Sequence, residues 1–215
     1  MNANSLWAHI FIDELAKGGI CTVAIAPGSR STPLTLAFAS HPGINVFSIL
    51  DERGAAFFAL GASLYQGSPA AVLCTSGTAA ANLFPAAMEA NLARVPLILI
   101  TADRPHDVRT SGANQSADQV KLFGSHVRWS EDVVPPQDQP HQRSVRYLRP
   151  LAARAISQTL GPVPGPVHLN FPFRKPLEPS KVAISMTPEM RDATTHHRHD
   201  PAFTTVQRGL AQIPD

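Results

Sequence analysis

The chain has 215 residues, of which 44% are hydrophobic and only 16% are charged. This length allows one α/β domain with a further segment, and the low charge, against roughly 25% in an average protein, suits a surface covered by another domain or subunit. The formal net charge of +2 is too small to indicate nucleic acid as the main partner, and no apolar run is long enough to predict a membrane span.

The N-terminus and the cysteines indicate a reducing compartment. Residues 1–19 contain acidic side chains and lack the basic start and apolar block of a secretory signal. Cys21 and Cys74 are the only cysteines, and each lies in an apolar run, so we expect two small core residues and neither a disulfide nor a metal site. We therefore predict a cytoplasmic protein.

Apolar spacing predicts helices and strands in alternation. A first helix begins with Ser5 as its cap and ends at Gly18-Gly19, and a second has Ser31 or Thr32 as its cap. Pro150 must kink the last helix or mark its true start. Further helices are predicted over 52–65, 76–93 and 143–160, and strands over 21–26, 44–50, 70–75, 95–101, near 126–129, and over 166–172. This order predicts an α/β fold, an open parallel sheet with helices on both faces.

The composition changes near residue 180. We assign residues 1–180 to one domain and residues 181–215 to a linker and the start of a truncated following domain. The second segment carries His196, His197 and His199, which fit either a metal site or a solvated linker. The linker is favoured because no other ligand has metal-site spacing nearby.

Four polar segments follow four successive strands, at residues 27–30, 51–53, 75–78 and 102–105. Ligands of open parallel sheets bind beyond the carboxyl ends of the strands, so these segments predict a polar cleft at one edge. Each segment also has a simpler interpretation as a turn, a helix cap, an ion pair or a favourable charge at a helix start. The long polar stretch after residue 101 is typical of a functional or disordered loop.

Several motifs together resemble the N-terminal domain of the 2-succinyl-5-enolpyruvyl-6-hydroxy-3-cyclohexene-1-carboxylate synthases, thiamine-diphosphate enzymes of menaquinone biosynthesis. The resemblance covers about residues 5–180. The segments that carry it are AIAPGSRSTPLTLA (24–37), DERGAAFFALG (51–61), TSGTAAANLFPAAMEA (75–90), LILITADRP (97–105), GANQ (112–115) and HLNFPFRKPL (168–177).

The resemblance implies a domain that binds the aminopyrimidine ring of thiamine diphosphate. It implies that the carboxyl of Glu52 hydrogen-bonds the ring and acts in catalysis. The other cofactor-binding residues that it implies are Pro27, Gly28, Ser76 and Thr78. For the substrates isochorismate and 2-oxoglutarate, it implies binding by Ser29, Arg30, Arg104, Asn114 and Gln115.

The resemblance further implies a homodimer or homotetramer and a Mg²⁺ or Mn²⁺ ion. The family holds this metal with a GDG…N segment of its third domain, which this sequence lacks, so we expect no metal site in this chain and no activity of the chain alone. Two alternatives stay open. One is another thiamine-diphosphate decarboxylase or synthase acting on 2-oxo acids, and the other is a non-catalytic binding or dimerisation module.

Overall fold

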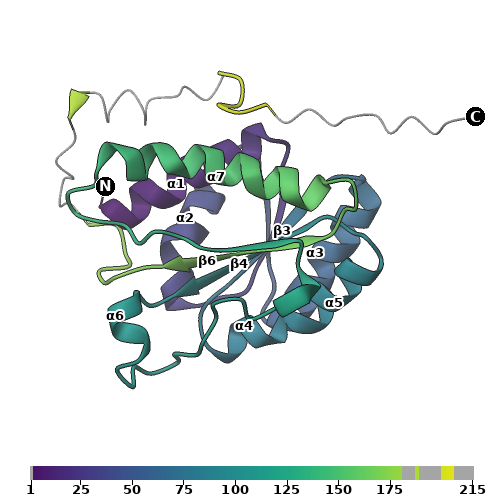
Figure 1. Cartoon of the computed structure of the whole chain (residues 1–215), viewed down its shortest axis with the longest axis horizontal. Coiled ribbons are helices and arrows are strands. Elements are labelled where there is room, and N and C mark those ends of the chain that lie inside the picture. Colours follow the sequence, from purple (N-terminus) through teal and green to yellow (C-terminus); the bar gives the residue numbers. More distant parts are fainter. Residues whose placement is uncertain (1, 181–186, 189–199, 206–215) are drawn as a thin grey trace, which may run out of the picture.

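Six parallel strands form the centre of the structure, a computed structural model that describes residues 2–180, 187–188 and 200–205 (Figure 1). The order across the sheet is β2-β1-β3-β4-β6-β5, and every neighbouring pair is parallel, so the predicted open parallel sheet is confirmed. The strands are β1 (Thr22–Ile25), β2 (Asn45–Ser48), β3 (Ala70–Cys74), β4 (Leu97–Asp103), β5 (Trp129–Asp132) and β6 (Pro166–Pro172).

Helices cover both faces of the sheet, as the sequence predicts. Helices α1 (Ala3–Lys17), α2 (Thr32–Ser40) and α7 (Gln142–Leu160) lie on one face. Helices α3 (Glu52–Gln66), α4 (Thr78–Asn82) and α5 (Phe84–Leu92) lie on the other (Figure 1). The short helix α6 (His106–Arg109) and the 3₁₀ turns η1 (Ser29–Ser31) and η2 (Gly124–His126) belong to the connecting loops.

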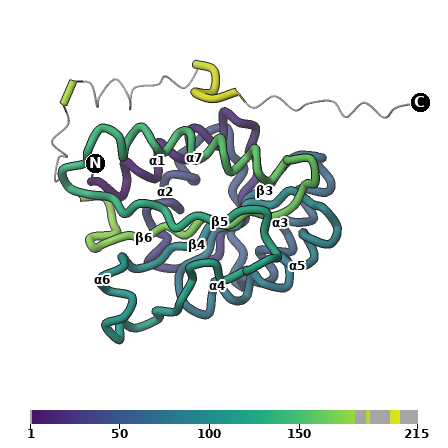
Figure 2. Tube along the Cα trace, viewed as in Figure 1, coloured from purple at the N-terminus to yellow at the C-terminus, as the bar shows by residue number. Residues whose placement is uncertain are grey.

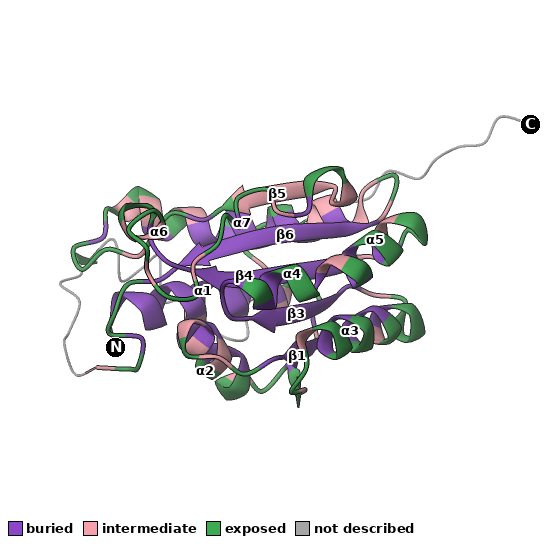
Figure 3. Ribbon diagram, turned by 90° about the horizontal axis from the view of Figure 1, so that it is seen from below, coloured by how far each residue is buried: buried purple, intermediate pink, exposed green. Residues whose placement is uncertain are grey.

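The two faces of the sheet have separate cores because successive side chains of a strand point to opposite sides. In β1, Val23 and Ile25 pack with α1 and α2, whereas Ala24 packs with the alanine-rich helices α3 to α5. Figure 3 shows β3, β4 and β6 buried along their length and the outer surfaces of α3 and α5 exposed. The edge strand β2 is exposed throughout.

Helices α1 and α7 pack against each other although about 130 residues separate them in the sequence (Figure 2). Their contact is a small apolar cluster outside the main core, formed by Leu6, Trp7, Ile10, Val145 and Leu148. The first and last helices of the domain are thereby joined on the same face of the sheet.

Two predicted helix details are wrong, and one of the two alternatives for Pro150 is excluded. Asn2, and not Ser5, caps α1, since the Asn2 side chain accepts a hydrogen bond from the backbone N–H of Ser5 at 2.9 Å. The predicted helix over 76–93 is divided into α4 and α5 at Leu83, because Pro85 has no N–H to continue the helical pattern. Helix α7 begins eight residues before Pro150 and runs through it, so Pro150 does not mark its start.

Three further expectations need correction, namely a cap at Thr75 or Ser76, the burial of Cys21, and capping by the Ser31 side chain. No side chain of Thr75 or Ser76 caps α4, whose N-cap is Gly77 with a φ of +77°. Cys74 is buried as predicted, but Cys21 is only half-buried, and its thiol donates to the side-chain oxygen of Gln66 at 3.8 Å. Ser31 is the N-cap of α2, yet its hydroxyl donates to the carbonyl of Gly28 at 2.9 Å and does not cap the helix.

The predicted linker and the predicted start of a following domain fall mostly outside the described residues. This includes His196, His197 and His199. The domain boundary near residue 180 therefore stays a prediction.

Candidate functional site

The four polar segments lie at one edge of the sheet. Strands β2, β1, β3 and β4 are adjacent in that order and all run in parallel, so their carboxyl ends point the same way. Residues 27–30 follow β1, residues 51–53 follow β2, residues 75–78 follow β3, and residues 102–105 overlap the end of β4. The topology thus brings together segments that are up to 78 residues apart in the sequence.

Glu52 is the first residue of α3, and its side chain is partly exposed. The helix begins there because the Asp51 carboxylate accepts a hydrogen bond from the N–H of Gly54 at 2.7 Å. Burial, and then the negative charge of Glu52, raise the pKa of the Cys74 thiol at the end of β3. The Glu52 carboxylate therefore lies within electrostatic reach of the end of β3, beside the segment that contains Ser76.

The loop after β1 packs tightly against the loop after β3. A Cβ atom at Gly28 would fall within the side chain of Thr75, so this contact requires a glycine. Pro27 and Ser29 are exposed at the sheet edge, as is Thr78 in the first turn of α4. The absence of side chains lets the loop at Gly28 approach Thr75 and the loop at Gly77 approach Gln115, so both glycines serve close packing between the loops of this edge.

Arg104 links three of the other predicted site residues. Its guanidinium is buried and donates to the hydroxyl of Ser76, to the carbonyl of Asn114, and to the carbonyl of Gln115 at 2.8 Å. The Gln115 side chain in turn donates to the carbonyl of Ser76 at 3.1 Å. A guanidinium has five N–H donors, so these contacts leave two of them for a ligand.

Arg30 lies close to Arg104. One N–H of Arg30 donates to the carbonyl of Phe173 at 2.8 Å, and the side chain is half-buried. Burial and the positive charge of Arg104 lower the pKa of Arg30, while Asp103 opposes this effect. Two guanidinium groups in one partly desolvated place favour the binding of an anion, particularly a carboxylate.

Buried charged side chains lie next to Arg104, the second arginine of the site. The Asp103 carboxylate is fully buried, accepts from the N–H of Arg104 at 2.7 Å, and forms an ion pair with Arg109 at 2.9 Å. Burial raises the pKa of Asp103, and hydrogen bonds from Asn170 and Arg104 partly offset this. Arg109 also donates to both carboxylate oxygens of Asp132, at 2.8 and 2.7 Å, which ties the long polar loop to β5.

Sequence reasoning missed Asp103, Arg109, Asn170 and the buried Gln119, which accepts a hydrogen bond from Gly77 N–H at 2.8 Å. Asp103 and Asn170 lie in segments that carry the resemblance, but nothing in the sequence indicates that their side chains meet. The long polar stretch is the one signal that points toward Arg109 and Gln119. The connection from β4 to β5, which includes this stretch, contains α6 and the 3₁₀ turn η2, so it is an ordered loop.

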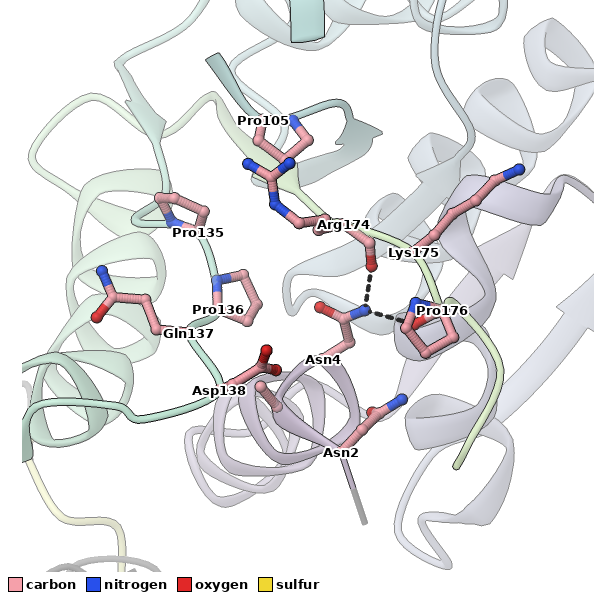
Figure 4. A pocket seen from close by; sticks show the side chains of 11 residues that line it. Asn2, Asn4, Pro105, Pro135, Pro136, Gln137, Asp138, Arg174, Lys175 and Pro176 are labelled. Atoms are coloured by element: carbon pink, nitrogen blue, oxygen red, sulfur yellow. Dashed lines mark hydrogen bonds between the residues drawn. The ribbon is translucent and has the colours of Figure 1, made fainter. Parts of the chain in front are cut away.

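A pocket of about 400 Å³, lined by both polar and apolar residues, lies further along the carboxyl edge (Figure 4). None of the predicted site residues lines it. Figure 4 shows the Asn4 side chain donating to the carbonyls of Arg174 and Pro176, which holds the chain after β6 across the start of α1. The lining residues are Asn2, Ala3, Asn4, Pro105, Pro135, Pro136, Gln137, Asp138, Arg174, Lys175 and Pro176.

Within residues 2–180, 187–188 and 200–205, no three histidine, cysteine, aspartate or glutamate side chains are grouped so that they could hold a metal ion. The helices of the same residues include none that is both long and apolar enough to cross a bilayer.

Comparison with known proteins places the chain in a protein family. Residues 7–122 match the family described as "Thiamine pyrophosphate enzyme, N-terminal TPP binding domain". A 2-succinyl-5-enolpyruvyl-6-hydroxy-3-cyclohexene-1-carboxylate synthase of Roseiflexus castenholzii (strain DSM 13941 / HLO8) is 59% identical over 214 residues, which are 99% of this chain and 37% of that protein.

Two further relatives carry the same name. One, from Roseiflexus sp. (strain RS-1), is 59% identical over 186 residues, which are 86% of this chain and 32% of that protein. The other, from Haloarcula marismortui (strain ATCC 43049 / DSM 3752 / JCM 8966 / VKM B-1809), is 58% identical over 179 residues, which are 83% of this chain and 30% of that protein. The chain thus spans about a third of the length of these curated relatives.

Proposed function

Because this chain belongs to the thiamine pyrophosphate enzymes, through their N-terminal TPP-binding domain, we propose that it is the pyrimidine-binding part of a 2-succinyl-5-enolpyruvyl-6-hydroxy-3-cyclohexene-1-carboxylate synthase. That enzyme joins decarboxylated 2-oxoglutarate to isochorismate. The observation that carries the proposal is the placement of Arg30 and Arg104 at one sheet edge: Arg30 donates to the carbonyl of Phe173, whose N–H donates to the carbonyl of Asp103, the residue before Arg104. Isochorismate has two carboxylates, and such a pair suits a dicarboxylic acid.

The residues present fit the pyrimidine side of thiamine diphosphate. Glu52 offers a carboxylate to a ring nitrogen, and the close contact between Gly28 and Thr75 holds the loops after β1 and β3 together beside it. Pro27, Ser76 and Thr78 complete the proposed contacts. When bound, the cofactor supplies the electron sink that decarboxylation of a 2-oxo acid requires. A divalent ion, Mg²⁺ or Mn²⁺, would be bound by a part of the full-length protein outside this chain.

In the proposed function, the residues of this chain would have separate roles toward the cofactor and the substrate. Glu52 holds or releases a proton at the ring nitrogen, as a general acid–base group must. Arg104 keeps two N–H donors for a carboxylate, while Arg30 keeps four, because only one is used by Phe173. The side chains of Ser29, Asn114 and Gln115 are exposed beside them and offer hydrogen bonds to the hydroxyl and carboxylate oxygens of the substrate.

Exposed apolar side chains on β2 and α3 support a homodimer or homotetramer. The rings of Phe47 on β2 and Phe58 on α3 are each partly exposed and pack together at 4.7 Å. Leu50, in the loop before α3, is 85% exposed, and Leu64 and Tyr65 near the end of α3 are 60% and 93% exposed. Exposed apolar side chains of this number favour association with another apolar surface. The free cysteines support a reducing compartment, so we place the protein in the cytoplasm.

The test is carbon dioxide release from 2-oxoglutarate by the full-length protein with thiamine diphosphate and Mg²⁺, with and without isochorismate. We expect release that depends on isochorismate, together with formation of the joined product. Release without isochorismate would indicate another 2-oxo acid decarboxylase or synthase, and no release would indicate a non-catalytic module. The 215-residue chain alone serves as the control, and we expect it to be inactive.

A further inference from the structure

Gln119 ties together the ends of three strands, although no motif includes it. Its side chain is fully buried within an otherwise exposed polar loop. The side-chain oxygen accepts from the N–H of Gly77 at 2.8 Å, next to Ser76. The side-chain nitrogen donates to the carbonyl of Ala102 at 3.2 Å and to the side-chain oxygen of Asn170 at 2.9 Å. Gln119 thereby joins the loop after β3 to the ends of β4 and β6.

The direction of each of these hydrogen bonds is fixed by its partner. A backbone N–H only donates and a backbone carbonyl only accepts, so the carboxamide of Gln119 has a single orientation that satisfies both. The side-chain oxygen of Asn170 also accepts from the hydroxyl of Thr101 at 2.8 Å, and its nitrogen donates to Asp103 and Asp132, each at 2.9 Å. Every donor and acceptor of the Asn170 carboxamide therefore also has a partner, and we call such a network saturated.

His168 closes the network inside the sheet. The hydroxyl proton of Thr101 is used toward Asn170, so its oxygen accepts from Nε2–H of His168 at 2.8 Å. Burial lowers the pKa of His168 to about 3, which keeps the ring neutral, and the hydrogen bond to Thr101 places its one proton on Nε2. A saturated buried network of this kind is costly to disturb, because loss of one member leaves others without partners.

We propose that Gln119 is a positioning residue that fixes the backbone of Ser76 and Gly77 and thereby the direction of the Arg104 guanidinium. The inference rests on the proposed function, in which Arg104 binds a substrate carboxylate. Ser76 connects the two residues, because its hydroxyl accepts from Arg104 and its successor Gly77 donates to Gln119. Gly77 has a φ of +77°, one of the many conformations open to glycine, and the hydrogen bond to Gln119 helps to select it.

Three variants of the full-length protein separate positioning from general stability. Gln119→Met keeps much of the volume and removes every hydrogen bond. Gln119→Glu keeps an oxygen for the N–H of Gly77 and loses the amide donor toward Ala102 and Asn170. Thr159→Val is the matched control, because it removes a buried hydroxyl that donates to the carbonyl of Gly165 at 2.6 Å, at the opposite end of the sheet.

The readouts are amide hydrogen exchange at Gly77 and the KM for isochorismate. In Gln119→Met we expect exchange at Gly77 to accelerate about tenfold or more and the KM to rise about tenfold, as loss of a buried hydrogen bond implies. Gln119→Glu should retain more of the protection at Gly77 than Gln119→Met does. Because Ser76 is also a proposed contact of thiamine diphosphate, the affinity for the cofactor should decrease in Gln119→Met as well, whereas Thr159→Val should change none of these readouts.

Unchanged exchange at Gly77 in Gln119→Met would overturn the inference, and so would equal acceleration in Thr159→Val. Faster exchange with an unchanged KM would also overturn it, because Arg104 would then be positioned without Gln119. The exchange measurement needs no turnover. If the unmodified protein did not use isochorismate, the proposed function would fail, whereas the exchange result would still decide whether Gln119 fixes the loop.

Discussion

Replacing Arg149 by methionine should strongly destabilise the domain. Arg149 on α7 and Glu14 on α1 are both buried, and the arginine donates to the carboxylate of Glu14 at 2.9 Å and to that of Asp13 at 2.8 Å. Methionine fills much of the arginine volume but leaves the Glu14 charge without its partner in the interior. Removal of one member of a buried ion pair costs about 3–5 kcal/mol.

The loss can be measured by thermal and urea unfolding of the 215-residue chain. For a protein of this size, 1 kcal/mol lowers the Tm by about 2–4 °C, so we expect a decrease of about 6–20 °C. A second substitution, Glu14→Gln in the Arg149→Met background, should recover part of the loss because it removes the unpaired charge. The matched control is Arg174→Met, whose ion pair with Asp107 is exposed, and the Tm should stay unchanged there.

The Glu14 carboxylate also accepts two backbone hydrogen bonds, so the effect of losing Arg149 can be measured at individual residues. The other oxygen of Glu14 accepts from the backbone N–H of Phe203 at 2.6 Å and of Thr204 at 3.3 Å. Loss of Arg149 should therefore also accelerate amide exchange at residues 203–204. A decrease in stability below about 1 kcal/mol, as for an exposed ion pair, would refute the reasoning that the α1–α7 contact depends on this buried charge pair.

Three further predictions concern the loop, the network and the surface. Gly28→Ala should lower the free energy of unfolding by about 1–3 kcal/mol because the added methyl overlaps Thr75. Gly61→Ala, in open space on α3, should raise it by about 0.4–1 kcal/mol. Urea unfolding of both variants tests this pair of effects. Burial lowers the pKa of His168 to about 3, so only the unfolded chain takes up its proton as the pH falls below about 6.5. Stability should therefore decrease from about pH 6.5 toward 3, less steeply in His168→Gln. Light scattering of the concentrated chain should give a mass above that of a monomer, and Tyr65→Lys should reduce it; a strictly monomeric mass would contradict this.

The architecture could be predicted from the sequence because hydrophobic patterns determine it. Residues 70–74 and 95–100 are apolar throughout, as in a strand that is buried on both faces, and polar segments follow each of them. The helix ends were less predictable. Ser5 and Asn2 are both suitable caps, and only the contact of the chain after β6 with Asn2 and Asn4 selects the earlier start.

The site could be predicted only in part, since spacing shows which segments share an edge and does not show which atoms meet. Arg104 was expected to face a substrate, and the structure adds that it also holds Ser76, Asn114 and Gln115 together. Gln119 could not be found, because a buried glutamine in a polar loop has the same sequence pattern as an exposed one. Its burial depends on contacts with β3, β4 and β6, which are distant in the sequence.

The last prediction separates a catalytic Glu52 from a charge that only favours the start of α3. In the full-length protein, Glu52→Gln should keep the affinity for thiamine diphosphate and slow hydrogen–deuterium exchange at C2 of the bound cofactor by about 10²–10⁴-fold. Glutamine keeps the size and a hydrogen bond but cannot exchange a proton with the ring.

Asp51→Asn is the matched control, because it removes the same charge one residue earlier and keeps the oxygen that accepts from Gly54. If Glu52 acts only on the helix, both variants should lose about 0.3–1 kcal/mol of stability and exchange at C2 should not change. If Glu52 is catalytic, only Glu52→Gln should slow exchange. Arg30→Ala should then weaken the use of isochorismate and leave exchange at C2 intact, since it would bind a substrate carboxylate and not the cofactor. Slow exchange in Asp51→Asn as well would mean that the local charge, and not proton transfer by Glu52, controls the reaction.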